Sequence, residues 1–207
     1  MEKGHIIVSI GRSFGAGGRA IGRQLSTLLD IPFYDNELLK EAAGEFGFSP
    51  EVFARADERP PSRLKRMVSM MYGVAETYQP ITLSTENLYQ AQSLVIRSIA
   101  QRSSCIIIGR TADYILRDFP RLLNVFVHAP VAYRALKIVE RGDAPSEVEA
   151  IELARQKDRR RQEYYNYFTG RQWGVASNYD LCLDSSLLAP LENAELIEFY
   201  LKKLKFL

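Results

Sequence analysis

Short apolar runs alternate with amphipathic stretches along most of this chain. Apolar runs of this length are typical of strands that are buried on both faces of a parallel sheet. The pattern predicts four such strands, over residues 6–10, 105–108, 122–127 and 179–183, and a weaker fifth over residues 32–34.

Helical periodicity fills the segments between these runs. Strands that alternate with helices indicate a doubly wound α/β fold, in which ligands bind beyond the carboxyl ends of the strands. We therefore expect the loops after Ile10, Ile108 and Val127 to form a site. The predicted helices cover residues 19–29, 37–46, 88–102, 112–116, 131–141, 147–168 and 191–203.

The stretch 57–90 departs from this pattern. It begins with DERPPSRLKRM, continues through a part rich in Met and Tyr, and contains no strand candidate. We interpret it as a mostly helical insert that covers the site or meets a second subunit. Its apolar cluster, residues 67–72, fits either a homodimer contact or burial against the chain's own core.

Length and charge narrow the possible functions. A chain of 207 residues suits one domain with a small insert, and a net charge of +2 argues against wholesale binding of nucleic acid or of a membrane surface. No segment approaches the roughly 20 apolar residues that cross a bilayer, and the N-terminus has no secretory pattern. We expect a cytoplasmic protein in which Cys105 and Cys182 are buried free thiols.

The first predicted strand runs into a loop rich in glycine, GRSFGAGGRA, which opens an amphipathic helix. This order presents backbone N–H groups and a helix N-terminus to a polyphosphate, although a plain tight turn is the alternative. The pattern G-x-x-x-x-G-K-[ST] would place a lysine here, and this loop has none. We expect Arg12 or Arg19 to supply the charge. The predicted cofactor-binding residues are Gly11, Arg12, Ser13, Gly15, Gly17, Gly18 and Arg19.

Two further segments carry arginine where a phosphate could bind. Arg110 follows Gly109 at the end of a predicted strand, so it is either an acceptor-phosphate ligand or a surface arginine. The run RQKDRRR, residues 155–161, lies in a long predicted helix. It is a solvated face, a nucleic-acid patch or a cationic element that closes over phosphates. Asp158 and Arg161 share one helix face, whereas Arg159 and Arg160 point elsewhere.

One aspartate, Asp35, follows the predicted strand at 32–34, and another, Asp184, follows the predicted strand at 179–183. Asp35 could position a hydroxyl or a metal-bound water, or it could cap the helix that starts at Glu37, and capping is the simpler role. Asp184 is most simply a turn or cap residue.

With these residues placed, the chain resembles the cytidylate kinase-like branch of the nucleoside monophosphate kinases. The motifs SIGRSFGAGGRAIGRQL, IPFYDNELL, CIIIGRTADYIL, VFVHAP, KDRRRQEYYNYFTGRQWG and YDLCLDSS occur in the order and spacing of that family. The resemblance implies one domain over residues 1–207. It also implies a P-loop NTP-hydrolase-type doubly wound five-stranded parallel sheet, with the insert at 57–90 and a lid at 155–174. The implied reaction moves the γ-phosphate of ATP to a nucleoside monophosphate with Mg²⁺, and CMP or dCMP is the expected acceptor.

The resemblance also implies roles for individual residues. The catalytic set is Arg19, Arg110, Asp158 and Arg161, and the substrate-binding set is Asp35, Arg110, Arg160 and Arg161. No metal ligand is assigned to the chain itself.

Several positions depart from the family's motifs. Gly17-Gly18-Arg19-Ala20 replaces Gly-Lys-Gly-Thr in a loop that is one residue longer, so the lysine and the hydroxyl are missing together. The signature Gly-Arg-Asp becomes Gly109-Arg110-Thr111, and His128 replaces an acidic residue. A nucleotide-binding regulatory protein with the kinase fold is therefore the alternative. A sulfotransferase-like donor and a nucleic-acid-binding role rank lower.

Overall fold

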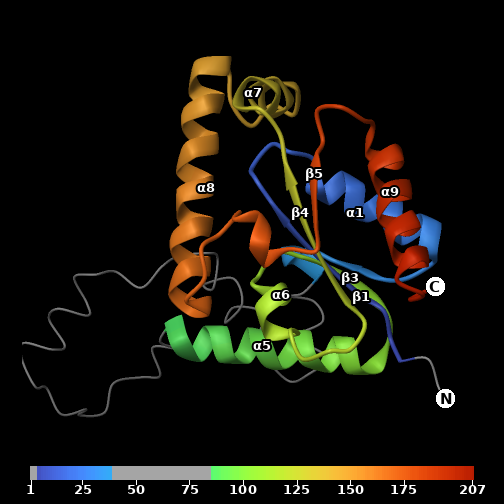
Figure 1. Cartoon of the computed structure of the whole chain (residues 1–207). Helices are drawn as coiled ribbons and strands as arrows, with labels where there is room; N and C mark the ends of the chain where they lie inside the picture. The colour runs from blue at the N-terminus through green and yellow to red at the C-terminus, as the bar shows by residue number, and fades with distance from the viewer. Residues whose placement is uncertain (1–3, 39–84) are drawn as a thin grey trace, which may run out of the picture.

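The computed structural model describes residues 4–38 and 85–207 (Figure 1). The strands are β1 (Ile7–Arg12), β2 (Phe33–Tyr34), β3 (Cys105–Ile108), β4 (Leu122–His128) and β5 (Leu181–Asp184). The helices are α1 (Gly18–Leu29), α5 (Thr85–Arg102), α6 (Ala112–Ile115), α7 (Val131–Glu140), α8 (Glu147–Thr169), the 3₁₀ helix η1 (Ala176–Asn178) and α9 (Pro190–Lys203). Most of the predicted insert, and the predicted helix beyond residue 38, lie outside the described residues.

All five strands form one parallel sheet in the order β2-β3-β1-β4-β5, which confirms the predicted doubly wound α/β fold. The central strand β1 pairs Ile10 with Ile108 of β3 and Arg12 with Val127 of β4. It is two residues longer at its carboxyl end than the apolar run predicts, because pairing with β4 continues through Gly11 and Arg12. Strand β5 begins two residues later than predicted, since η1 takes up the chain before it.

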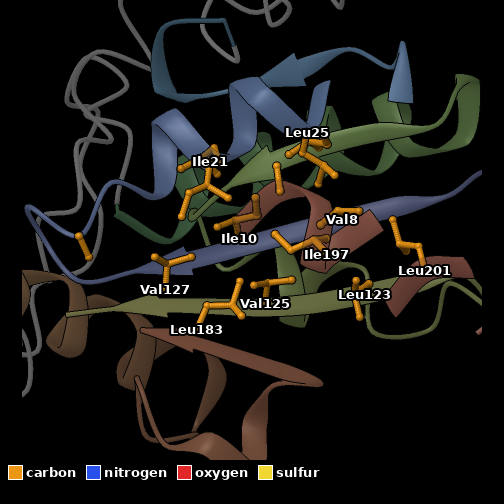
Figure 2. Packing of buried hydrophobic residues seen from close by; sticks show 14 of the residues in the cluster. Val8, Ile10, Ile21, Leu25, Leu123, Val125, Val127, Leu183, Ile197 and Leu201 are labelled. Carbon is orange, nitrogen blue, oxygen red and sulfur yellow. The ribbon is translucent and has the colours of Figure 1, made fainter. Parts of the chain in front are cut away.

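The two faces of the sheet carry separate apolar cores. Val8 and Ile10 of β1 pack with the fully buried Leu25 of α1 and Ile197 of α9 on one face (Figure 2). Ile7 of the same strand points to the opposite face, where it meets α5 and α6. Burial on both sides explains why the strands read as continuous apolar runs rather than as alternating ones.

Helices α7 and α8 pack on each other at the carboxyl edge of the sheet through a third apolar cluster (Figure 1). Helix α8 begins at a cap, where the Ser146 hydroxyl accepts a hydrogen bond from the Glu149 amide at 3.3 Å. Near the other end of α8, Phe168 stacks on Tyr89 of α5 with ring centroids 4.0 Å apart. Phe168 therefore helps to pack α8 against α5.

The cysteines confirm one expectation and correct another. Both are free thiols. Cys105 is buried in β3, and burial raises the pKa of its thiol to about 12. Cys182 is exposed, so the prediction of burial was wrong there. It lies on the edge strand β5, where its side chain lines a surface hollow with Phe126 and His128 instead of packing under a helix.

None of the helices within residues 4–38 and 85–207 is both long and apolar enough to span a membrane.

Replacing Leu25 with alanine should lower the free energy of unfolding by about 2–5 kcal/mol, because it empties space between α1 and the sheet. The matched control is Leu28→Ala on the same helix, where the side chain is 39% exposed. That change should cost less than about 1 kcal/mol. Urea denaturation measures both values, and equal losses would contradict the packing of α1 described above.

Candidate functional site

The glycine-rich segment turns the chain from β1 into α1. Gly15 and Gly17 have φ angles of +84° and +74°, in the left-handed region that favours glycine. A Cβ on Gly15 would also lie 2.9 Å from the Arg134 carbonyl oxygen. Two of the predicted cofactor-binding glycines are thus required by the shape of the loop.

The loop is fixed to its surroundings through a few backbone groups. The Ser13 amide donates to the Val127 carbonyl at 2.9 Å, and the Ser185 hydroxyl donates to the Ala16 carbonyl at 2.7 Å. Within the part of the chain that the structure describes, the amides of Gly15, Gly17 and Gly18 donate to no acceptor. Unpaired amides at the start of a helix are groups that can stabilise an anion.

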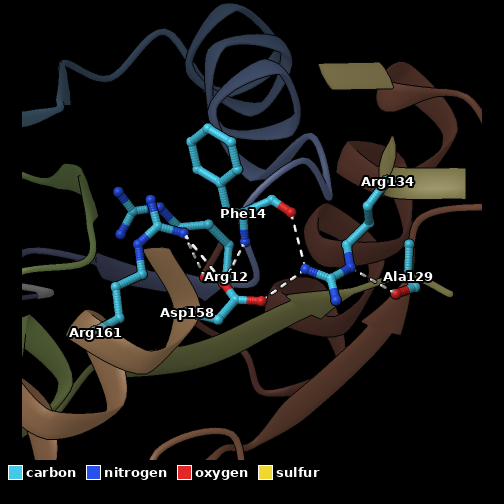
Figure 3. A network of polar contacts seen from close by, with 6 residues as sticks. All are labelled: Arg12, Phe14, Ala129, Arg134, Asp158 and Arg161. Atoms are coloured by element: carbon cyan, nitrogen blue, oxygen red, sulfur yellow. Dashed lines mark hydrogen bonds and ion pairs between the residues drawn. The ribbon is translucent and has the colours of Figure 1, made fainter. Parts of the chain in front are cut away.

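Asp158 lies between this loop and α7 (Figure 3). Its Oδ1 accepts the Phe14 amide at 2.7 Å, and its Oδ2 accepts from Arg134 Nη1 at 2.6 Å. The same Nη1 donates to the Phe14 carbonyl at 3.0 Å, and Arg134 Nε donates to the Ala129 carbonyl at 3.1 Å. Asp158 and Arg161 do share one helix face, and Arg161 Nη1 donates to the Arg12 carbonyl at 3.1 Å.

Arg12 is the last residue of β1, and its side chain depends on two glycines. A Cβ on Gly109 would lie 2.0 Å from Arg12 Nη1, and a Cβ on Gly18 would lie 2.9 Å from Arg12 Cβ. The guanidinium of Arg12 therefore lies against the end of β3, beside the expected acceptor residue Arg110. Arg110 itself is 5% exposed.

Arg12, Arg110 and Arg161 line one small pocket at the carboxyl ends of β1 and β3. The pocket has a volume of about 30 Å³, and the buried Asp113 and an aromatic wall complete it. The wall consists of Tyr164, Tyr165, Trp173 and Tyr179. Three guanidinium groups around so small a space favour an anionic group.

A cavity of about 720 Å³ lies on the other side of the loop. Residues 12–21 form one wall, while α7 contributes Tyr133 and Lys137 and the start of α9 contributes Pro190 and Asn193. Among the lining residues of this cavity and of the small pocket, Arg12 and Arg161 are common to both. The two spaces therefore meet at these two side chains.

Other predicted residues lie apart from the small pocket. Arg19 is half-exposed and forms ion pairs from Nη2 to Asp35 Oδ2 at 2.6 Å and to Glu37 Oε2 at 2.9 Å. Asp35 also accepts the amides of Glu37 and Leu38, which confirms its capping role. Arg160 is exposed on α8 and lines neither the small pocket nor the 720 Å³ cavity. Asp184 accepts from the Ser186 amide and hydroxyl, as a turn residue does.

Asp113 is a buried carboxyl in the wall of the small pocket. Burial raises its pKa above the ordinary value, although a 2.6 Å hydrogen bond from the Tyr165 hydroxyl opposes that shift. Burial and the nearby carboxylate raise the pKa of Tyr165 in turn. Asp113, Arg134 and Ser185 were not singled out from the sequence. Each acts through a partner distant in the chain, so no local motif marks it.

No group of three or more His, Cys, Asp or Glu side chains in the described ranges is arranged to hold a metal ion.

Comparison with known proteins now adds to this geometry. A model of the cytidylate kinase-like family matches residues 7–187. The chain belongs to this family. No curated protein matches it.

Solved structures share the fold of this cytidylate kinase-like protein. An uncharacterized protein from Eubacterium ventriosum superposes with a TM-score of 0.69 at 23% identity, covering 96% of this chain and 99% of that one. A shikimate kinase from Bacteroides thetaiotaomicron gives a TM-score of 0.55 at 11% identity, covering 95% and 98%. A gluconokinase from Sinorhizobium meliloti gives 0.52 at 14% identity, covering 100% and 98%. These likenesses establish the P-loop kinase fold.

Replacing Asp113 with asparagine should remove a pH-dependent cost of folding. A carboxyl whose pKa is raised in the folded state binds its proton more tightly there, so the wild type loses stability as pH rises through that raised pKa. The free energy of unfolding of the wild type, minus that of Asp113→Asn, should therefore fall as pH rises from about 4. Urea denaturation across pH measures this difference. A difference that stays constant or increases would contradict the burial of a charged Asp113.

Proposed function

We propose that this protein transfers the γ-phosphoryl group of ATP to a nucleoside monophosphate, with CMP or dCMP as the first acceptors to test. In this reaction the bond from the γ-phosphorus to the β-phosphate oxygen breaks, and a bond to an acceptor phosphate oxygen forms. The products are ADP and a nucleoside diphosphate. The observation that carries the proposal is the meeting of two spaces at Arg12 and Arg161.

The larger cavity suits the donor. Its volume of about 720 Å³ falls in the range of ligand pockets, and the amides of Gly15, Gly17 and Gly18 border it. Lys137 and Arg141 lie on the α7 side, where Lys137 forms an ion pair with Glu140 and Arg141 forms one with Asp143. Mg²⁺, when bound, would supply positive charge to the donor phosphates. The chain has Ala20 where the pattern has a hydroxyl ligand, so position 20 supplies no side-chain ligand for the ion.

The smaller pocket suits the phosphate of the acceptor. Three arginines line it, and Arg110 at the end of β3 would orient that phosphate. Arg161 on α8 would neutralise charge as the phosphoryl group moves between the two spaces. Asp35 and Arg160, which the family resemblance assigns to the substrate, would act from outside this pocket.

Between the two arginines considered for the role of the missing lysine, the contacts favour Arg12. The guanidinium of Arg19 forms ion pairs with Asp35 and Glu37, and Arg19 lines only the larger of the two spaces. That of Arg12 lines both spaces. We therefore assign Arg12 to the transferring phosphoryl group and Arg19 to holding α1 against the segment after β2.

A second candidate function is a nucleotide-binding regulatory protein with little catalysis. It is favoured by Gly18 and Ala20, which stand where the family has lysine and a hydroxyl. Binding of ATP and CMP in a calorimeter, without any product, would identify this function.

The direct test is a coupled assay of ADP release with ATP, Mg²⁺ and each of CMP, dCMP, UMP and AMP. With the best acceptor, Arg12→Met should lower kcat by about 10²-fold or more, because the charge at the point of transfer is lost. Arg19→Ala should lower kcat by less than about 5-fold. The matched control is Arg159→Met, an exposed arginine on α8, which should retain wild-type kcat.

No turnover with any acceptor would contradict the proposed reaction. A larger loss for Arg19→Ala than for Arg12→Met would contradict the assignment of Arg12.

A further inference from the structure

We infer that Phe14, in the loop between β1 and α1, is a latch that joins the phosphate loop to α8. Asp158 is the positioning residue of that latch. The latch gives the donor loop a fixed shape without a lysine. Its role in donor binding rests on the proposed function, whereas its role in loop structure does not.

Both the backbone amide and the backbone carbonyl of Phe14 are hydrogen-bonded to side chains. Asp158 Oδ1 accepts the Phe14 amide at 2.7 Å, and Arg134 Nη1 donates to the Phe14 carbonyl at 3.0 Å. Asp158 and Arg134 then bind each other at 2.6 Å, which closes a three-membered network (Figure 3). Their side chains are only 17% and 13% exposed, so water competes little for these bonds.

The ring of Phe14 is held as well. The guanidinium carbon of Arg141 lies 5.4 Å from the ring centroid, and that of Arg161 lies 5.6 Å from it. Below these cations, the ring packs on the apolar cluster between α7 and α8, which includes Ala150 and Ala154. The side chain of Phe14 thus packs against α7 and α8, while its backbone is hydrogen-bonded to Asp158 and Arg134.

This arrangement requires a side chain with two acceptor oxygens. The two oxygens of Asp158 face two donors, the Phe14 amide and Arg134 Nη1. The amide group of an asparagine has one acceptor oxygen and one NH₂ donor, so it can satisfy only one of them. The other donor would face an N–H group in a half-buried site.

The latch constrains both of its partners. Gly15 is the single residue between Phe14 and Ala16. The Phe14 amide is bound by Asp158 and the Ala16 carbonyl by Ser185, so the bonds on either side of Gly15 fix the orientation of its amide. On the other side, Asp158 and Arg161 place one face of α8 against residues 12–14. This face of α8 therefore cannot move away from the loop unless the Asp158 bonds break.

Amide hydrogen exchange of the free protein tests the latch without any nucleotide. In Asp158→Asn, the amides of Phe14 and Ala16 should exchange at least about 10-fold faster than in wild type, which is the effect of losing a charge-assisted hydrogen bond. Amides of β3 should not change. The matched control is Glu198→Gln, the same chemical change in an ion pair with Lys202 on α9, and it should leave loop exchange unaffected.

Calorimetry then tests the link to the donor. The dissociation constant of a non-hydrolysable ATP analogue should rise at least about 10-fold in Asp158→Asn, while that of CMP should stay within about 2-fold. A general loss of structure would weaken both ligands. Should Asp158→Asn fail to fold, Arg134→Lys carries the same measurements, since it keeps the charge but loses the bond from Nε to the Ala129 carbonyl.

Loop exchange within about 2-fold of wild type in the folded variant would overturn the latch. Faster loop exchange in a protein that binds no nucleotide would support the latch and contradict the proposed function instead.

Discussion

The central place of β1 in the sheet determines where every charged group of the site lies. This strand is hydrogen-bonded to β3 on one side and to β4 on the other, and all three run parallel. Their carboxyl ends therefore meet, and the glycine loop, Arg110 and the start of α7 follow them. Because both faces of β1 are covered by helices, the strand cannot shift its register without moving buried side chains to the wrong core.

A phosphate loop without lysine has to obtain positive charge from another part of the chain. In this molecule arginines from β1, from the end of β3 and from α8 gather around one small pocket. Arg12 can reach this pocket because Gly109 has no side chain, since a Cβ on Gly109 would collide with the guanidinium of Arg12. A side chain at this position would therefore displace the guanidinium of Arg12. The latch at Phe14 complements this arrangement by fixing the loop that the arginines surround.

The sequence predicted the parallel sheet, its flanking helices and the carboxyl-end location of the site, because apolar runs and glycine turns are local signals. It also paired Arg12 with the loop and Arg110 with the end of β3. It named both Arg12 and Arg19 as sources of the missing charge and placed Arg19 in the catalytic set. The ion pairs of Arg19 with Asp35 and Glu37, which join residues distant in the chain, are the reason that we propose Arg12 instead. Arg134 carried no signal, because its importance comes from Asp158, 24 positions away along the chain. The sequence wrongly predicted that Cys182 is buried. Its side chain lies on the edge strand β5 and lines a surface hollow, and an apolar run does not indicate whether a strand lies at the edge of a sheet.

We propose that Arg12 supplies the charge where the proposed donor and acceptor spaces meet. A crystal structure with a non-hydrolysable ATP analogue and CMP tests it most directly. The account predicts a guanidinium nitrogen of Arg12 about 3 Å from a phosphate oxygen, with Arg19 still paired to Asp35. The contrary result is an Arg19 that has left Asp35 for the phosphates, while Arg12 contacts no phosphate at all.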